Sequence, residues 1–397
     1  MESVGASARY ARAVPLVLLL ILLSALPDAM LVPVLRDLFV ERYGVSAAHA
    51  QAFLAVNLLG AGLAVPLVRR LRRRWPAWVV ASIGAVADAS LLGLMWLPIG
   101  FVPTLVVRAV EGVADVATFA ALFQLLGALG GRGSAWRMGV GASLLVGGLG
   151  AGAVVGGAAV RASAAGPTVA FVIGAVCCLA TGLGAFLGSR VLDRVEPGAE
   201  PAVAVAADRP PLWPTLLMAA SDRATGAALT AVFASFLAKN LGYDPAERGR
   251  LVGLPLLLMA VGAAPAGWIA DRFGTLRVRT LTAVVYAACF AQVAWLGFST
   301  FALSAVLLVL GLAAAPLLPA SLALVVRSGH GSGGLAAFRA AGDAGYFLGI
   351  LAVVVVGTFA DGDHMPTQQG IMLGFALGHL ACTVAAAARL RGACTAA

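Results

Sequence analysis

Long, nearly uninterrupted apolar runs recur along the whole sequence and limit what it can fold into. Twelve of them, separated by charged or turn-rich breaks, reach the ~20 residues that a helix needs to cross a lipid bilayer. Only 11% of the residues are charged, whereas a soluble domain carries roughly 25%. The sequence therefore predicts an all-α membrane protein with many spans, embedded in a lipid bilayer.

The predicted spans form two groups of six. The first group covers residues 13–35, 48–68, 77–98, 101–128, 138–160 and 167–188, and the second covers 212–238, 249–270, 279–298, 300–326, 338–360 and 369–389. Between them, residues 191–211 are rich in Pro, Ala and charge, which favours a flexible cytoplasmic linker. We expect one six-helix bundle in residues 1–190 and a second in residues 212–397.

The placement of basic residues predicts the orientation. With the N-terminus inside, 19 Lys and Arg residues fall in or beside inner loops and six fall outside, so both termini are expected in the cytoplasm. Arg69–Arg74 and the 277–279 loop belong to the inner set. Basic residues confined to loops do not indicate nucleic-acid binding. Abundant Ala, Gly and Arg suggest a GC-rich bacterial genome, and hence a bacterial inner membrane.

Three charged residues share one face of the predicted span 101–128. Arg108, Glu111 and Asp115 are three and four positions apart, a spacing that places them on one helical stripe. A charge near the bilayer centre costs at least ~2.5–3.5 kcal/mol, and such residues usually mark solute or proton pathways. Asp28 lies ~10 Å from the outer end of its own span, which is the depth of Arg108.

Further charged and polar residues fall inside predicted spans. Asp222 and Arg223 are adjacent and cannot share a helix face, so Arg223 is expected to need a carboxylate on another helix. Six intramembrane acids stand against Arg108 and Arg223; they are Asp28, Asp88, Glu111, Asp115, Asp222 and Asp343. Protonated acids, a wet cavity or a cationic solute would each relieve this excess. Candidate cavity residues are Asp88, Asn57, Gln124 and Gln292.

Four short motifs resemble those of the major facilitator superfamily. The loop GWIADRFGTLRVR, residues 267–279, is similar to that family's G-x-x-x-D-R-x-G-x-[RK]-[RK] loop. RAVEG (108–112), GLGAGAVVGG (148–157) and FRAAGDAGYFLG (338–349) resemble its motifs in the fourth, fifth and eleventh helices. The candidate gating residues are Gly267, Asp271, Arg272, Gly274, Arg277, Arg339 and Asp343.

The resemblance implies twelve helices in two bundles that give alternating access to a midplane cavity. In that family the fourth-helix arginine faces the first helix and couples protonation to solute binding. An Asp28–Arg108 pair is therefore the sharpest hypothesis, with a static pair that only holds helices together as its alternative. The twelfth helix is usually peripheral in this fold, so His379 is discounted as a proton site.

The fifth-span motif also has a structural interpretation. Gly148, Gly152 and Gly156 follow small-xxx-small spacing, which is typical of close helix packing, and with Gly157 they also suit a hinge. Ala153 stands where antiporters of the family usually have proline. The loop after the second span, LAVPLVRRLRRRWP, keeps the basic residues of the family's Asp-Arg-Gly motif but lacks the Asp and the second Gly.

These observations favour a monomeric transporter that exports a small drug-like or secondary-metabolite compound in exchange for protons. Metabolite uptake, lipid movement and a transport-dead receptor or assembly protein with the same fold remain alternatives. The sequence has no H-E-x-x-H, G-x-S-x-G or G-x-x-x-x-G-K-[ST] motif. We therefore expect no enzyme activity, no cofactor and no metal.

Overall fold

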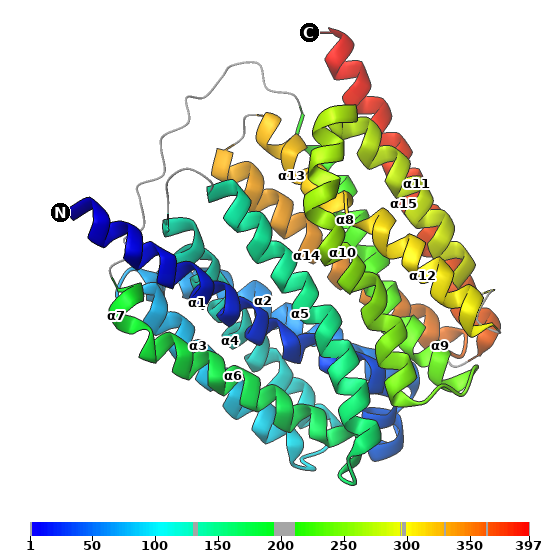
Figure 1. Cartoon of the computed structure of the whole chain (residues 1–397). Helices are drawn as coiled ribbons and strands as arrows, with labels where there is room; N and C mark the ends of the chain where they lie inside the picture. Colours follow the sequence, from blue (N-terminus) through cyan, green and yellow to red (C-terminus); the bar gives the residue numbers. More distant parts are fainter. Residues whose placement is uncertain are drawn as a thin grey trace. The chain divides into compact units, whose positions relative to one another are not determined.

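The computed structural model describes residues 2–129, 134–193, 211–293, 295, 299–328, 331–362 and 364–396. Throughout these residues the chain forms helices, turns and short loops, with no β-strand (Figure 1). It divides into two compact units: unit 1 holds Met1–Val45 and Phe53–Glu200, and unit 2 holds Ser46–Ala52 and Pro201–Ala397. Most of the predicted linker lies outside the described residues, as 194–210 do.

Unit 1 contains the first group of predicted spans. Its helices are α1 (Glu2–Met30), α2 (Ala47–Arg72, from Phe53 on), α3 (Ala77–Trp96), α4 (Phe101–Ala128), α5 (Ser134–Ala162), α6 (Val169–Leu187) and the short α7 (Ser189–Leu192). A 3-10 turn, η1 (Val32–Val34), and a π-helical turn, η2 (Asp37–Glu41), continue α1, and a 3-10 turn, η3 (Gly166–Thr168), precedes α6. Apolar side chains of α1, α3 and α4, such as Val17, Ala81 and Leu122, form a closed core.

Unit 2 contains the second group. Its elements are α8 (Trp213–Ala228), the π-helical η4 (Leu229–Phe233), α9 (Ala234–Lys239), α10 (Pro245–Phe273), α11 (Thr275–Val293), α12 (Thr300–Ala314), α13 (Leu317–Arg327), α14 (Gly331–Phe359) and α15 (Met365–Ala396). The predicted seventh span is thus divided among α8, η4 and α9, and the tenth between α12 and α13. The ninth span begins four residues earlier than predicted, because α11 starts at Thr275.

Ten helical stretches among the described residues are long and apolar enough to cross a membrane. They match predicted spans, except that 101–128 and 212–238 are not among them. The first of these two is the single helix α4, which carries Arg108, Glu111 and Asp115, and the second is the segment that η4 interrupts. The structure therefore supports a multi-pass membrane protein, while the count of twelve spans stays a prediction.

Local sequence explains where α10 begins and ends. The Asp244 carboxylate accepts a hydrogen bond from the backbone N–H of Glu247 at 2.8 Å, and the Glu247 side chain accepts one from the Asp244 N–H at 3.1 Å. This reciprocal cap satisfies two N–H groups at the helix start. Pro245 at the first helical position has no N–H group and therefore needs no hydrogen-bond acceptor. At the other end Gly274 has φ +94°, a conformation that glycine adopts without strain.

Helices α1 and α5 touch backbone to backbone. A Cβ atom at Gly152 would lie 2.1 Å from the Leu26 carbonyl oxygen, and one at Gly156 would lie 2.2 Å from the Met30 oxygen. One turn earlier, a Cβ at Gly148 would meet Ala25 at 2.7 Å, and Gly157 is buried beside Gly156. The small-xxx-small stripe therefore packs α5 onto α1 in this structure.

Unit 2 repeats this packing between its own first and fifth helical segments. A Cβ at Gly345 of α14 would lie 2.1 Å from the Ala220 oxygen of α8, and one at Gly349 would lie 2.8 Å from the Ala224 oxygen. Gly44 and Gly242, which follow the first segments of the two units, both have φ +66°. Shared packing, shared turn geometry and a π-helical turn in each first segment indicate two structurally related halves.

We predict that Gly152→Ala destabilises the protein and lowers its thermal unfolding midpoint, because a methyl group would collide with the α1 backbone at a cost of about 1–3 kcal/mol. Gly139→Ala is the matched control on the same helix, since among the described residues no atom outside the helix's own backbone lies within 4 Å of a Cβ there. The control should be neutral or stabilising, because alanine is the better helix former. Thermal unfolding in detergent compares the two, and equal midpoints would contradict close α1–α5 packing.

Candidate charge clusters

A cluster of charged residues lies inside unit 1 around Arg108. We call it the unit 1 cluster; its members are Asp28, Asn57, Asp88, Arg108, Glu111 and Asp115. Arg108 and Glu111 form an ion pair across one turn of α4, with side chains only 5% and 1% exposed. The second oxygen of Glu111 accepts a hydrogen bond from the Asn57 amide of α2 at 2.9 Å. Both oxygens of this buried carboxylate therefore have partners.

The glycine of RAVEG explains how Asn57 reaches Glu111. A Cβ at Gly112 would lie 2.1 Å from the Asn57 carbonyl oxygen, so only glycine lets α2 approach α4 this closely. On the same helix α2, the Phe53 ring lies under the Arg108 guanidinium, with 4.9 Å between the guanidinium carbon and the ring centroid. Such a contact stabilises a desolvated cation by roughly 2 kcal/mol. Helix α2 thus supports both members of the ion pair.

Asp28 belongs to the unit 1 cluster but is not the direct partner of Arg108. Its charge interacts through space with Arg108 and Glu111. Among the described residues, no ion pair shorter than 4 Å joins Asp28 to Arg108, and Glu111 takes that place. The equal depth of Asp28 and Arg108 and the family resemblance together favoured this pair. Neither takes account of Glu111, one helical turn from Arg108 on the same face.

Asp88 and Asp115 complete the acidic side of the cluster. Asp88 is buried on α3, where one carboxylate oxygen accepts a hydrogen bond from the Cys178 thiol of α6 at 3.2 Å. Its other oxygen is buried and has no hydrogen-bond partner among the described residues. Asp115 is also buried, and its charge interacts with those of Asp28, Asp88, Glu111 and Arg108. Four carboxyl groups therefore share one arginine.

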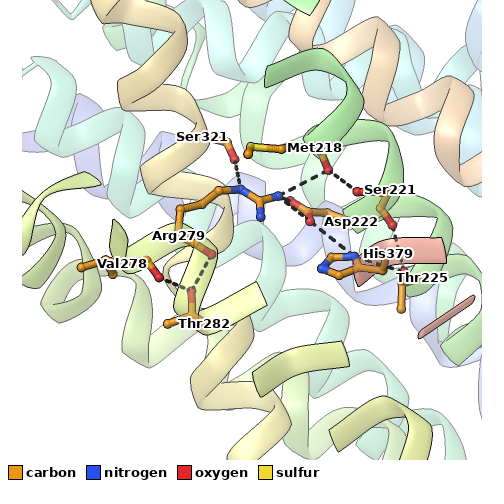
Figure 2. A network of polar contacts seen from close by, with 9 residues as sticks. All are labelled: Met218, Ser221, Asp222, Thr225, Val278, Arg279, Thr282, Ser321 and His379. Carbon is orange, nitrogen blue, oxygen red and sulfur yellow. Dashed lines mark hydrogen bonds and ion pairs between the residues drawn. The ribbon is translucent and has the colours of Figure 1, made fainter. Parts of the chain in front are cut away.

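In unit 2, Asp222 of α8 is the centre of a second group, the unit 2 network. It comprises Asp222, Arg279, Ser321, Thr225 and His379 (Figure 2). One Arg279 nitrogen donates to both Asp222 oxygens at 2.7 Å, and the Arg279 Nε donates to the Ser321 hydroxyl of α13 at 3.1 Å. The Arg279 side chain is fully buried, whereas that of Asp222 is 16% exposed. The ion pair therefore joins α8 to α11 inside the unit.

Arg279 corrects the sequence analysis. It was counted among inner-loop residues, but α11 begins at Thr275 and places it one full turn inside the helix. Arg279 is therefore a buried charge inside a helix, as Arg108 is in unit 1. A polar stripe could have revealed it, because Thr275, Arg279, Thr282 and Tyr286 recur at spacings of four, three and four on one face of α11.

His379 is a second correction. It was discounted as peripheral, yet it is 1% exposed and its Nδ1 atom lies 3.7 Å from an Asp222 oxygen. The same nitrogen lies 3.4 Å from the Thr225 hydroxyl of α8. Helix α15 therefore contributes a titratable group to the interior of unit 2.

Arg223 pairs with a carboxylate on another helix. Its neighbour Asp222 cannot be that partner, because adjacent residues do not share a helix face. The Arg223 guanidinium lies 3.8 Å from Asp343 of α14, and the other Asp343 oxygen accepts a hydrogen bond from Arg339 at 2.8 Å. These side chains are partly exposed, at 48% for Arg223 and 35% for Asp343. The pair lies outside the buried unit 2 network and joins α8 to α14.

The remaining candidate residues have exposed positions. Asp271 of α10 pairs with Arg327 of α13 at 3.4 Å, and both side chains are more than half exposed. The Arg272 guanidinium lies over the Trp268 ring, and Arg277 is exposed. A Cβ atom at Gly267 would have no contact within 4 Å in the described part of the chain. Gln124 and Gln292 also have exposed side chains, on α4 and α11. Asp271 thus forms a surface contact between α10 and α13.

The sequence profile of the Major Facilitator Superfamily matches residues 17–350, so this chain belongs to that family. Two solved structures share its fold; both are of a bacterial homolog to the human lysosomal transporter Spinster, in an inward-facing conformation. The unoccupied form has a TM-score of 0.74 and 15% identity, and the occupied form has 0.73 and 14%, each covering 97% of both chains. No curated protein matches the sequence. The protein is a multi-pass membrane transporter for a small-molecule solute.

The buried ion pair of unit 2 predicts strong coupling between two substitutions. Asp222→Asn and Arg279→Gln should each destabilise the protein by about 3–5 kcal/mol, because each leaves a buried charge without its partner. The double variant should be less destabilised than the sum of the two by about 1–3 kcal/mol. Unfolding in detergent measures all three.

Asp271→Asn is the matched control, since the same substitution breaks an exposed ion pair. It should change stability by under about 1 kcal/mol. Additive effects of Asp222→Asn and Arg279→Gln would show that the two side chains do not depend on each other.

Proposed function

We propose that the protein is a proton-coupled secondary transporter that exports a small, partly apolar compound by alternating access. The observation that carries the proposal is the composition of the unit 1 cluster, in which four carboxyl groups, three of them buried and that of Asp28 half-buried, share Arg108. One arginine neutralises one carboxylate. The other acids need a proton, water or a cationic solute to remain inside a low-dielectric protein.

The arrangement of the cluster offers two alternative partners for the arginine. Arg108 pairs directly with Glu111 on its own helix, while Asp28 of α1 lies within reach of its charge. A proton that neutralises Glu111 frees Arg108 to turn toward Asp28, and a proton on Asp28 favours the pair seen here. Because Asp28 and Arg108 belong to different helices, proton binding can be linked to their packing. The family's fourth-helix arginine, which faces the first helix, supports this role.

Export is favoured by the likeness of GLGAGAVVGG to the fifth-helix motif of antiporters, although Ala153 replaces the proline. The excess of carboxyl groups favours a cationic or neutral solute over an anion. We place the protein in a bacterial inner membrane as a monomer. Both termini are proposed to lie in the cytoplasm, because basic residues concentrate in the loops of one side. Uptake, lipid movement and a transport-dead receptor are the outcomes that the experiment below separates.

Proton coupling predicts that Asp28→Asn and Glu111→Gln abolish substrate-dependent proton flux. The full chain is reconstituted in vesicles that contain a pH-sensitive dye, a pH gradient is imposed, and a panel of cationic and neutral amphipathic compounds is added. The unchanged protein should release protons in response to at least one compound. In the two variants this proton flux should be at least about tenfold lower, because removing a proton-binding group removes the coupled step.

Glu41→Gln is the matched control for Glu111→Gln, because the Glu41 side chain is 65% exposed and its ion pair with Arg36 is long, at 3.8 Å. It should retain the flux. Compound movement without proton movement would reject coupling but keep transport. No movement of any compound, with the fold intact, would favour the receptor alternative.

A further inference from the structure

The interior of unit 2 holds a histidine that the transport proposal does not use. The His379 side chain is fully buried on α15, and its Nε2 atom has no hydrogen-bond partner among the described residues. Its Nδ1 atom faces α8, at 3.7 Å from Asp222 and 3.4 Å from the Thr225 hydroxyl (Figure 2). A buried imidazole with one free nitrogen beside a carboxylate has both a place for a proton and a counter-charge for it.

Asp222 already forms an ion pair with Arg279. A single Arg279 nitrogen contacts both of its oxygens, while the Arg279 Nη1 atom is buried without a partner in the described part of the chain. The carboxylate therefore lies between a permanent cation on α11 and a potential cation on α15. It can neutralise one of them fully, and a second buried positive charge costs several kcal/mol if it is left unpaired.

We propose that His379 is a proton-binding residue and that its protonated ring competes with Arg279 for Asp222. Proton uptake then strengthens the contact of α8 with α15 and weakens its contact with α11. The partly exposed Asp222 is the member of the group through which a proton can enter, because the side chains of Arg279 and His379 are 0% exposed. The protonation state of His379 thus determines whether α8 contacts α15 or α11 more strongly.

The groups that face His379 come from three helices. Helix α8 presents Asp222, the Thr225 hydroxyl and the backbone of Ser221. Helix α11 presents the guanidinium of Arg279 and the Tyr286 ring, whose centroid is 5.2 Å from that of the imidazole. On α15 itself the buried Thr383 hydroxyl lies one turn further along. Asp222 and Arg279 supply the charges that act on the ring.

This inference is independent of the unit 1 cluster, because the proton is bound by different residues. Proton flux that depends on Asp28 and Glu111 can be absent while His379 still titrates, and the reverse also holds. The experiment therefore measures protonation of one side chain rather than transport.

Histidine-selective isotope labelling and NMR of the full chain in nanodiscs report the protonation of each imidazole. The chain has four histidines, so single glutamine substitutions of the other three assign His379 by elimination, and His379→Gln removes its signal directly. The His379 signal should change between about pH 5 and 9. In the Asp222→Asn, Arg279→Gln double variant, which removes both charges together, this change should move by about one pH unit or more.

A His379 signal that stays constant over this range would overturn the proposal. A titration that is identical in the double variant would overturn the role of Asp222 and Arg279. The NMR signal of the exposed His364, one residue before α15, provides the reference and should be the same in the double variant as in the unchanged protein.

Hydrogen–deuterium exchange tests the competition between helices. After correction for intrinsic rates, exchange in the α11 segment 275–290 should rise about threefold from high to low pH, because the Arg279 contact weakens. His379→Gln should abolish this dependence, and His364→Gln should retain it. Equal pH dependence in both variants would show that proton binding at His379 does not loosen α11.

Discussion

The cost of leaving a charge without a partner in an apolar interior governs how both halves of this protein are built. Arg279 is completely buried, and it is tolerated because Asp222 and Ser321 fix two of its nitrogens. Arg108 is tolerated in the same way by Glu111 and by the face of Phe53. The Asp222–Arg279 pair requires α8 and α11 to remain in register, and the contacts of Phe53 and Asn57 with the Arg108–Glu111 pair require the same of α2 and α4. Electrostatics and helix packing therefore impose one common constraint.

Close backbone contact is what makes that register possible. In a bilayer the hydrophobic effect does not drive helix to helix, and small residues that allow dense packing take its place. Gly152 brings α5 onto α1, and Gly345 brings α14 onto α8. Gly112 does the same for α2 and α4, and the result is a hydrogen bond from Asn57 to the buried Glu111. Glycine positions therefore determine which polar groups meet.

The membrane-spanning helices could be predicted from the sequence because each of them needs a long apolar run. Such runs can be identified without knowledge of any tertiary contact. The partners of the charged residues could not be predicted in the same way. Arg279 was assigned to a loop, since it follows Arg272 and Arg277 in one basic stretch of the sequence. His379 was judged by the expected place of its helix, and a helix that is apolar on every face gives no periodic signal for its orientation.

The two halves share their packing but differ in charge. In the unit 1 cluster, the one arginine is outnumbered by carboxyl groups, and under our proposal proton or solute binding completes the balance. In the unit 2 network, Asp222 is outnumbered by Arg279 and the potential cation His379, and under our proposal a proton there displaces an existing contact. The unit 1 cluster suits a site that binds and releases a proton or solute. The unit 2 network suits a site in which Asp222 exchanges one cationic partner for another. An ancestral repeat that kept its glycines while its charges diverged would give each half a different response to the same proton.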